Sequence, residues 1–148
     1  MQTIAPAIAK AATFGGVAAW MVSRNSASRA QVRRLVTNIG SDPDRVDGES
    51  YSTLLRRQGH VQGALMMMAH WNLSTLKRDC ERIHIPAVYI AGAADKAVPP
   101  RISKEAAGRT PQGSYLELEA LGHLAHEEAP ETVANVIRGE WDRLKVSQ

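Results

Sequence analysis

Residues Ile85–Pro100 read IPAVYIAGAADKAVPP, and this stretch decides the fold class. Its centre, Ala87–Ala91, is a short unbroken apolar run with β-branched and aromatic members, bounded by proline and glycine. Such a run is typical of a strand that is buried on both faces of a parallel sheet. The two prolines at the end of the stretch suit the first turn of a helix, which we expect to continue to about Gly108.

A second strand and a final helix are predicted further along the chain. Residues Ser114–Glu119 read as a strand after a proline–glycine turn, and Ala120–Ala129 read as a loop. A helix begins at Pro130, and its apolar face is made of Val133, Val136, Ile137, Trp141 and Leu144. The order strand, helix, strand, helix indicates an α/β fold with parallel strands. Two such strands do not form a stable sheet alone, so we expect both to have further neighbours.

The preceding 82 residues read as helices separated by turns. The expected helices are Arg29–Ile39, Ser50–Arg57, Val61–Trp71 and a short one that is capped by Ser74 and runs to Arg82, with turns at Gly40–Asp44 and Asp47-Gly48. The apolar segment Ile4–Val22 is interrupted by lysine, proline and glycine, so it predicts two short amphipathic helices rather than a membrane span or a secretory signal. We therefore expect residues 1–82 to form a helical cap and residues 83–148 to belong to an α/β core.

Composition and charge exclude several classes of protein. The 148 residues are 44% hydrophobic and 22% charged, which is the mixture of a globular domain. A single cysteine, Cys80, excludes an internal disulfide and fits a reducing compartment, so we expect a cytoplasmic location. The net charge of +3 is uneven, because residues 1–82 hold 11 basic and 6 acidic side chains, and residues 83–148 hold 7 and 9. The basic half is either a solvated face or a surface that attracts an acidic ligand or an anionic lipid. No basic–aromatic motif indicates nucleic-acid binding.

Two residues placed just after the predicted strands could carry chemistry. Asp95 follows the first strand, and His123 follows the second, 28 residues later. Ligands of parallel sheets bind outside the carboxyl ends of the strands, so both side chains should emerge at the same edge. A carboxylate that accepts a hydrogen bond from an imidazole fixes its tautomer, and the histidine can then take a proton from a nucleophile. The structural alternative is that Asp95 only caps a turn and His123 is a polar loop residue.

This pattern resembles the C-terminal part of α/β-hydrolase-fold proteins. The resemblance rests on Gly-x-x-Asp-x-x-Val-Pro-Pro, with Asp95, and on Gly122-His123 followed by Glu128-Ala129-Pro130-Glu131. It implies Asp95 as the triad acid and His123 as the general base, with His126 as the competing histidine because only His123 directly follows glycine. His123 and His126 without a third ligand do not indicate a metal site, and we expect no cofactor.

The chain departs from that family in one large respect. No Gly-x-Ser-x-Gly nucleophile elbow occurs in it, and the family's upstream oxyanion loop has no counterpart. Ser103 lies on a predicted helix rather than on a strand-to-helix turn. We therefore expect the chain to be a C-terminal fragment of such a protein, preceded in the intact fold by the nucleophile half, and to be catalytically inactive alone.

A closer resemblance covers the helical half. The stretch Gly59–Leu73, reading GHVQGALMMMAHWNL, is similar to the cap of the magnesium-chelatase accessory proteins of bacteriochlorophyll synthesis, as are Ile4–Trp20 and Gly40–Asp42. The resemblance implies a role in magnesium insertion into protoporphyrin, a tetrapyrrole ligand and chelatase subunits as partners. Met67 and Trp71 share a helix face and are the candidate ligand-lining residues. The structural alternative is that Met66, Met67 and Met68 pack in a core.

Two other functions stay open at this point. The intact protein could be a capped serine hydrolase acting on a small ester, amide or carbon–carbon bond, with Asp95 and His123 serving an upstream serine. It could also be a non-catalytic module that binds a ligand under the cap.

Overall fold

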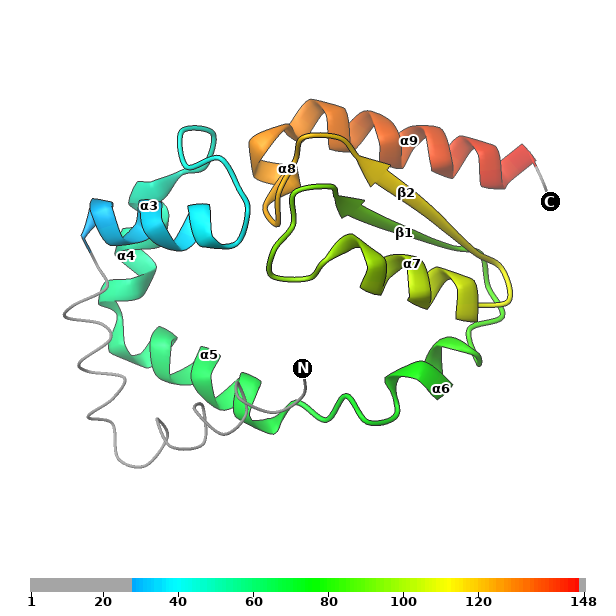
Figure 1. The fold of residues 1–148 in the computed structure, drawn as a ribbon, viewed down its shortest axis with the longest axis horizontal. Helices are drawn as coiled ribbons and strands as arrows, with labels where there is room; N and C mark the ends of the chain where they lie inside the picture. Colours follow the sequence, from blue (N-terminus) through cyan, green and yellow to red (C-terminus); the bar gives the residue numbers. More distant parts are fainter. Residues whose placement is uncertain (1–27, 147–148) are drawn as a thin grey trace. The chain divides into compact units, whose positions relative to one another are not determined.

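A computed structural model describes residues 28–146 of the chain (Figure 1). The helices expected within Ile4–Val22 lie outside the described residues. The described part divides into two compact units, one formed by residues 28–34 and 47–73 and the other by residues 35–46 and 74–146. Residues 35–46 thus belong with the strands, although the sequence places them in the expected cap. The cap itself, as a functional domain, stays a prediction.

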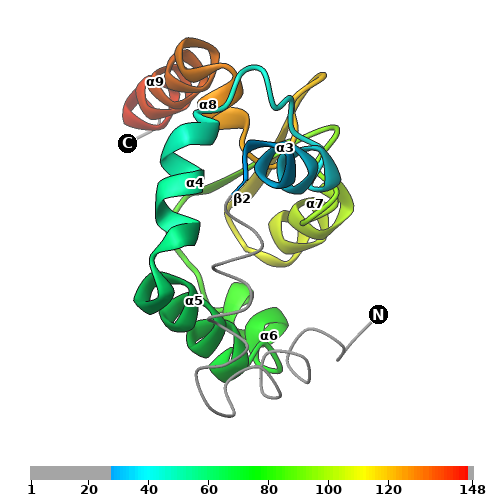
Figure 2. The ribbon, with the colours of Figure 1, turned by 90° about the vertical axis from the view of Figure 1, so that its left-hand side faces the viewer.

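A pair of parallel strands forms the centre of the second unit. Strand β1 spans Ala87–Gly92 and strand β2 spans Gly113–Leu118, with Ala87 opposite Gly113 and Gly92 opposite Leu118. Helix α7, Pro100–Arg109, connects the strands and packs on both. The figures show α7 and the last helix on opposite sides of the strand pair (Figures 1 and 2). The predicted α/β arrangement of two neighbouring parallel strands with flanking helices is therefore confirmed, and the strand ends differ from the prediction by one residue.

The segment after β2 corrects one expectation. Residues Ala125–Glu128 form a short helix, α8, where the sequence predicts only loop. Four residues make a single turn, which is too short to show a helical period in the sequence. Helix α9 then spans Pro130–Val146 and packs against α8. The predicted apolar face of α9 is only partly covered, since Ile137 and Trp141 are 54% and 61% exposed.

The segment that leads into β1 corrects a second expectation. Helix α6 spans Leu76–Cys80, and its N-cap is Thr75, which makes no side-chain capping bond, rather than Ser74. The helix packs on α7, and Arg109 at the end of α7 forms a 3.0 Å ion pair with Glu81. The buried apolar side chains of this unit are Val36, Val46, Cys80, Ala91, Ala107, Leu118 and Leu121.

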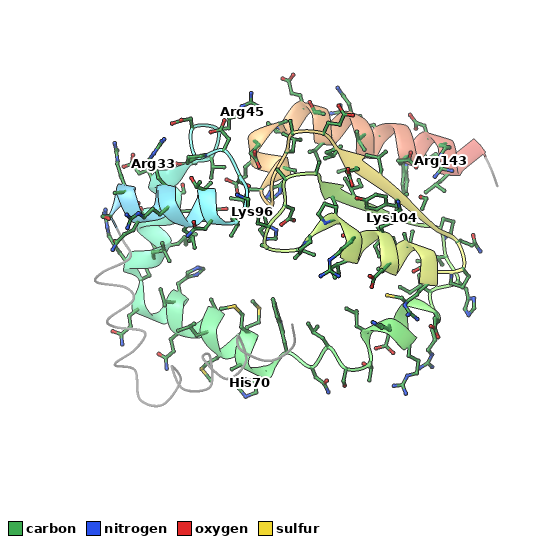
Figure 3. All side chains as sticks on the ribbon, viewed as in Figure 1. Arg33, Arg45, His70, Lys96, Lys104 and Arg143 are labelled. Atoms are coloured by element: carbon green, nitrogen blue, oxygen red, sulfur yellow. The ribbon has the colours of Figure 1, made fainter. Side chains whose placement is uncertain are left out.

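Three helices make up the described part of the first unit, and the boundary between the units falls inside one of them. They are α3, Arg29–Asn38, α4, Gly48–Arg56, and α5, Gln58–His70. The predicted turn at Asp47-Gly48 is in fact the start of α4, because the Asp47 carboxylate accepts hydrogen bonds from the backbone N–H groups of Glu49 and Ser50. Figure 3 shows His70 at the end of α5, where its Nδ1 lies 2.7 Å from the Met66 carbonyl oxygen.

The methionine-rich helix α5 exposes much of its apolar surface. Met66 and Met67 are 44% and 56% exposed, while Val61 and Ala69 are buried. Trp71, the predicted last residue of this helix, is instead the extended C-cap residue after it and is 55% exposed. Met66 and Met67 are therefore not buried by the described residues. Their role toward a ligand stays a prediction. Across residues 28–146, none of the helices has the length and apolar character needed to cross a membrane.

Candidate functional site

The loop after β1 holds Asp95 in one orientation. One carboxylate oxygen, Oδ1, accepts hydrogen bonds from the backbone N–H groups of Ala97 at 2.9 Å and Val98 at 2.8 Å. This is the turn geometry that aspartate side chains favour after a strand, because the carboxylate satisfies N–H groups that no sheet partner reaches. Only 9% of the Asp95 side chain is exposed. The second oxygen, Oδ2, is thereby left to point toward the loop after β2.

His123 meets that second oxygen. Its Nδ1 lies 3.0 Å from Asp95 Oδ2, so the two side chains predicted to approach each other do so. Because an ionised carboxylate only accepts hydrogen bonds, this contact requires a proton on Nδ1. In the neutral ring Nε2 then carries the free electron pair, on the side of the ring away from Asp95. This is the tautomer that can take a proton from an alcohol or a water molecule. The catalytic roles of Asp95 and His123 stay predictions.

A pocket of about 310 Å³ lies beside this pair in the second unit. Its polar lining includes Asp95, Ser103, His123 and His126, and its apolar lining includes Ile90, Val98, Leu118 and Val133. The volume is at the lower end of the range for small-molecule sites, which starts at about 300 Å³. Apolar walls with a few convergent polar groups are what such sites have. The pocket therefore suits a small organic group that reaches the His123 ring.

The second histidine of the loop lies differently. His126 lines the same pocket, but its Nε2 is 3.7 Å from Glu127 Oε1 rather than against Asp95. The side chain of His126 is 66% exposed, against 38% for His123. Within the described part of the chain, no group of three histidine, cysteine or acidic side chains is arranged to hold a metal ion. Of the two histidines, His123 is the one placed to act with a carboxylate.

Sequence reasoning gave no role to a carboxylate that the structure places under the His123 loop. Glu128 is 8% exposed, and its Oε1 accepts a hydrogen bond of 2.9 Å from the Gly122 backbone N–H. Its Oε2 accepts a bond of 3.1 Å from the N–H of Asp42. Glu128 appears in the sequence pattern quoted above, but only the folded chain shows which N–H groups it serves.

Residues 39–42 also contact both loops of the site. The Ile39 carbonyl accepts a hydrogen bond of 3.1 Å from the backbone N–H of Lys96, a residue of the Asp95 loop labelled in Figure 3. The Ser41 hydroxyl oxygen accepts one of 2.8 Å from the N–H of Leu124, next to His123. Residues 39–42 thus form hydrogen bonds with both the Asp95 loop and the His123 loop.

Two glycines allow these segments to approach closely. A Cβ on Gly122 would lie 2.2 Å from the carbonyl oxygen of Gly40, and a Cβ on Gly92 would lie 2.3 Å from that of Leu121. Gly40 itself has a φ of +89°, a conformation that side chains disfavour. The site is therefore assembled from backbone contacts that larger residues would block.

Comparison with known proteins agrees with the closer of the two resemblances. No protein-family model matches the chain. A search of curated proteins finds the magnesium-chelatase 30 kDa subunit of Rhodobacter capsulatus, to which 117 residues, 79% of the chain, are 36% identical. The chain spans 41% of the length of that relative. Over most of its own length, the chain is thus similar to part of a magnesium-chelatase subunit.

Proposed function

We propose that this chain serves a function related to magnesium chelatase and is the C-terminal part of an α/β-hydrolase-like protein. The observation that carries the proposal is the 36% identity to the chelatase subunit over 79% of the chain. In this proposal the protein assists magnesium insertion into protoporphyrin in bacteriochlorophyll synthesis, through contact with a tetrapyrrole and with chelatase subunits. A cytoplasmic location belongs to the same proposal.

The exposed apolar residues of α5 support a flat apolar ligand. Met67 lies in α5, Trp71 is the C-cap residue four positions later, and both side chains are more than half exposed. A thioether and an indole are adaptable, polarisable partners for an aromatic macrocycle. Titration of the chain with protoporphyrin, followed by porphyrin fluorescence, tests this. Met67→Ala and Trp71→Ala should each weaken binding at least about threefold, the loss of roughly 0.7 kcal/mol. Leu54→Ala, which removes a 37% exposed apolar side chain from α4, should not.

Contact with the chelatase is tested separately from ligand binding. The purified chain is added to the chelatase subunits of a photosynthetic bacterium, and both co-precipitation and the rate of magnesium insertion into protoporphyrin are measured. Binding to a subunit or a change in the insertion rate supports the proposal. A chain that neither binds a subunit nor alters the rate over a wide concentration range contradicts it.

The Asp95–His123 contact favours a second candidate, a capped serine hydrolase whose nucleophile comes from an upstream segment. The isolated chain should then hydrolyse an activated ester no faster than its Asp95→Ala, His123→Ala variant. The reason is that the histidine has no positioned nucleophile, and loss of one oxyanion donor alone costs on the order of a hundredfold. Turnover that depends on both residues would contradict this expectation, and Ser103→Ala would then show whether the pocket serine is the nucleophile.

The gene sequence separates the candidates further. An in-frame continuation upstream of Met1 that encodes a Gly-x-Ser-x-Gly elbow supports the hydrolase. A continuation with the fold but without the elbow supports a ligand-binding role on the same scaffold.

A further inference from the structure

We propose that Glu128 is a positioning residue that fixes the His123 ring against Asp95 by joining the histidine loop to residues 39–42. The inference rests on the proposed function, because it assigns a purpose to the Asp95–His123 pair. Glu128 touches neither side chain of the pair in any contact the structure records, so it acts through the backbone. Its burial, at 8% exposure, sets it apart from the acidic side chains of the surface.

The two oxygens of Glu128 have separate tasks. Oε1 accepts from the N–H of Gly122, the residue directly before His123, and Oε2 accepts from the N–H of Asp42. A carboxylate has acceptor sites on both oxygens, whereas the amide of glutamine has one acceptor and one donor. A Glu128→Gln side chain therefore has nearly the same shape but leaves one of the two N–H groups facing another donor. An unpaired buried donor is costly, and bonds to charged groups are the stronger ones.

Residues 39–42, which Glu128 contacts through Asp42, also hold both loops of the site. Residues 39–42 are bonded to the Asp95 loop through the Ile39 carbonyl and to the His123 loop through the Ser41 hydroxyl. Glu128 adds the bond between Asp42 and Gly122 that closes this frame. With the frame closed, the separation of the two loops is fixed, and the 3.0 Å approach of His123 Nδ1 to Asp95 Oδ2 follows. If the Glu128 bonds are broken, the His123 ring can move away from the Asp95 carboxylate although neither residue has been substituted.

The experiment compares Glu128→Gln with two other variants of the full chain, kept dilute enough to sediment as a monomer. Glu131→Gln, a charge-matched change in the exposed first turn of α9, is the control. Asp95→Asn removes the carboxylate of the pair itself. Amide hydrogen exchange reports the Gly122 and Asp42 bonds. The nitrogen resonances of ¹⁵N-labelled histidine report the ratio of the Nδ1–H to the Nε2–H tautomer of His123, which a merely structural role of Glu128 would not move.

In Glu128→Gln, exchange at Gly122 or Asp42 should accelerate at least about tenfold, because one charge-assisted bond is lost. The Nδ1–H tautomer of His123 should decrease toward the ratio found in Asp95→Asn, while Glu131→Gln matches the wild type. Should Glu128→Gln fail to fold, Ser41→Ala, which removes the acceptor of the Leu124 N–H, must shift the tautomer in the same direction.

Two results would overturn the inference, and they differ. If exchange accelerates but the tautomer ratio stays at the wild-type value, Glu128 only stabilises the fold, and the proposed function is untouched. If Asp95→Asn leaves the ratio unchanged, the Asp95–His123 pair does not exist in solution, and the hydrolase-like site fails together with the inference.

Discussion

Asp95 illustrates how a single side chain is aimed. Its Oδ1 accepts hydrogen bonds from two backbone N–H groups, which orients the carboxylate so that Oδ2 meets His123. This part of the site could be predicted from the sequence, because both residues follow strands that lie side by side in a parallel sheet. The role of Glu128 could not be predicted from the sequence. Its donors are backbone N–H groups 6 and 86 residues away, and every residue type except proline has such a group, so the sequence does not show which ones it binds.

Tyr115 gives a direct test of the fold around β2. Partial burial, together with the hydrogen bond and negative charge of Glu117, raises the pKa of Tyr115 from 10.0 to about 12. Tyr115 should therefore ionise near pH 12 when tyrosinate absorbance is followed during an alkaline titration. Tyr115→Phe should remove that step, and Tyr51→Phe should leave it.

The same shift predicts how stability depends on pH. Between about pH 10 and pH 12 the folded state keeps the Tyr115 proton while the unfolded state releases it, so the free energy of unfolding should fall as pH rises through this window. Glu117→Gln should lower the pKa of Tyr115 in the folded state, because it removes the charge and weakens the acceptor that favour the protonated phenol. The pH range over which stability falls should then end at a lower pH. Denaturant titrations at several alkaline pH values would show no such change if Tyr115 were exposed to water.

Gly122 should tolerate no side chain. A Cβ there would lie 2.2 Å from the Gly40 carbonyl oxygen and 2.5 Å from the Ser41 nitrogen, so residues 39–42 must move away from the His123 loop. Gly122→Ala is expected to destabilise the chain by at least about 2 kcal/mol, since overpacking typically costs 1–3 kcal/mol. Gly108→Ala is the matched control, because open space surrounds that position in α7 and alanine favours a helix by up to about 1 kcal/mol. Equal denaturation midpoints for the two variants would contradict the close approach.

Among the elements, local signals predicted the strands best. The apolar run and its proline and glycine boundaries place β1 correctly, because the information lies within the strand itself. The start of α4 was missed since Asp47 and Gly48 have the composition of a turn, and the N-cap role of Asp47 depends on the residues that follow. The exposure of the α9 face depends on what lies opposite it, which no pattern within the helix specifies.

The exposed elements predict self-association. Within residues 28–146 the sheet has two strands, so each has an edge without a strand beside it, and α9 exposes Ile137 and Trp141. Free edges and apolar faces promote intermolecular pairing. Sedimentation velocity should show association that grows with concentration, and Ile137→Lys should reduce it. Ile102→Lys adds the same charge at a 39% exposed position on α7, so it is the control that separates the effect of losing the α9 face from the effect of added charge. A wild-type chain that stays monomeric at high concentration would contradict the prediction.

At the level of the whole molecule, the path of the chain is discontinuous. Residues 35–46 belong to the second unit, residues 47–73 belong to the first, and the chain from residue 74 onward belongs to the second again. The sequence reads as a simple succession of cap and core, because composition changes only once along it. That residues 39–42 belong with the strands became visible only through their hydrogen bonds to the loops that follow β1 and β2.

The bond between Asp42 and Glu128 therefore has a consequence for the order of folding. It spans 86 residues, and closing a flexible loop of that length costs on the order of 4 kcal/mol of chain entropy. The strand pair and α7 involve much shorter loops and should form first, so the bond between Asp42 and Glu128 should form only after the rate-limiting barrier. Glu128→Gln should then speed unfolding in stopped-flow measurements while refolding keeps nearly its wild-type rate. The attachment of residues 39–42 to the two loops of the site would then form last and open first.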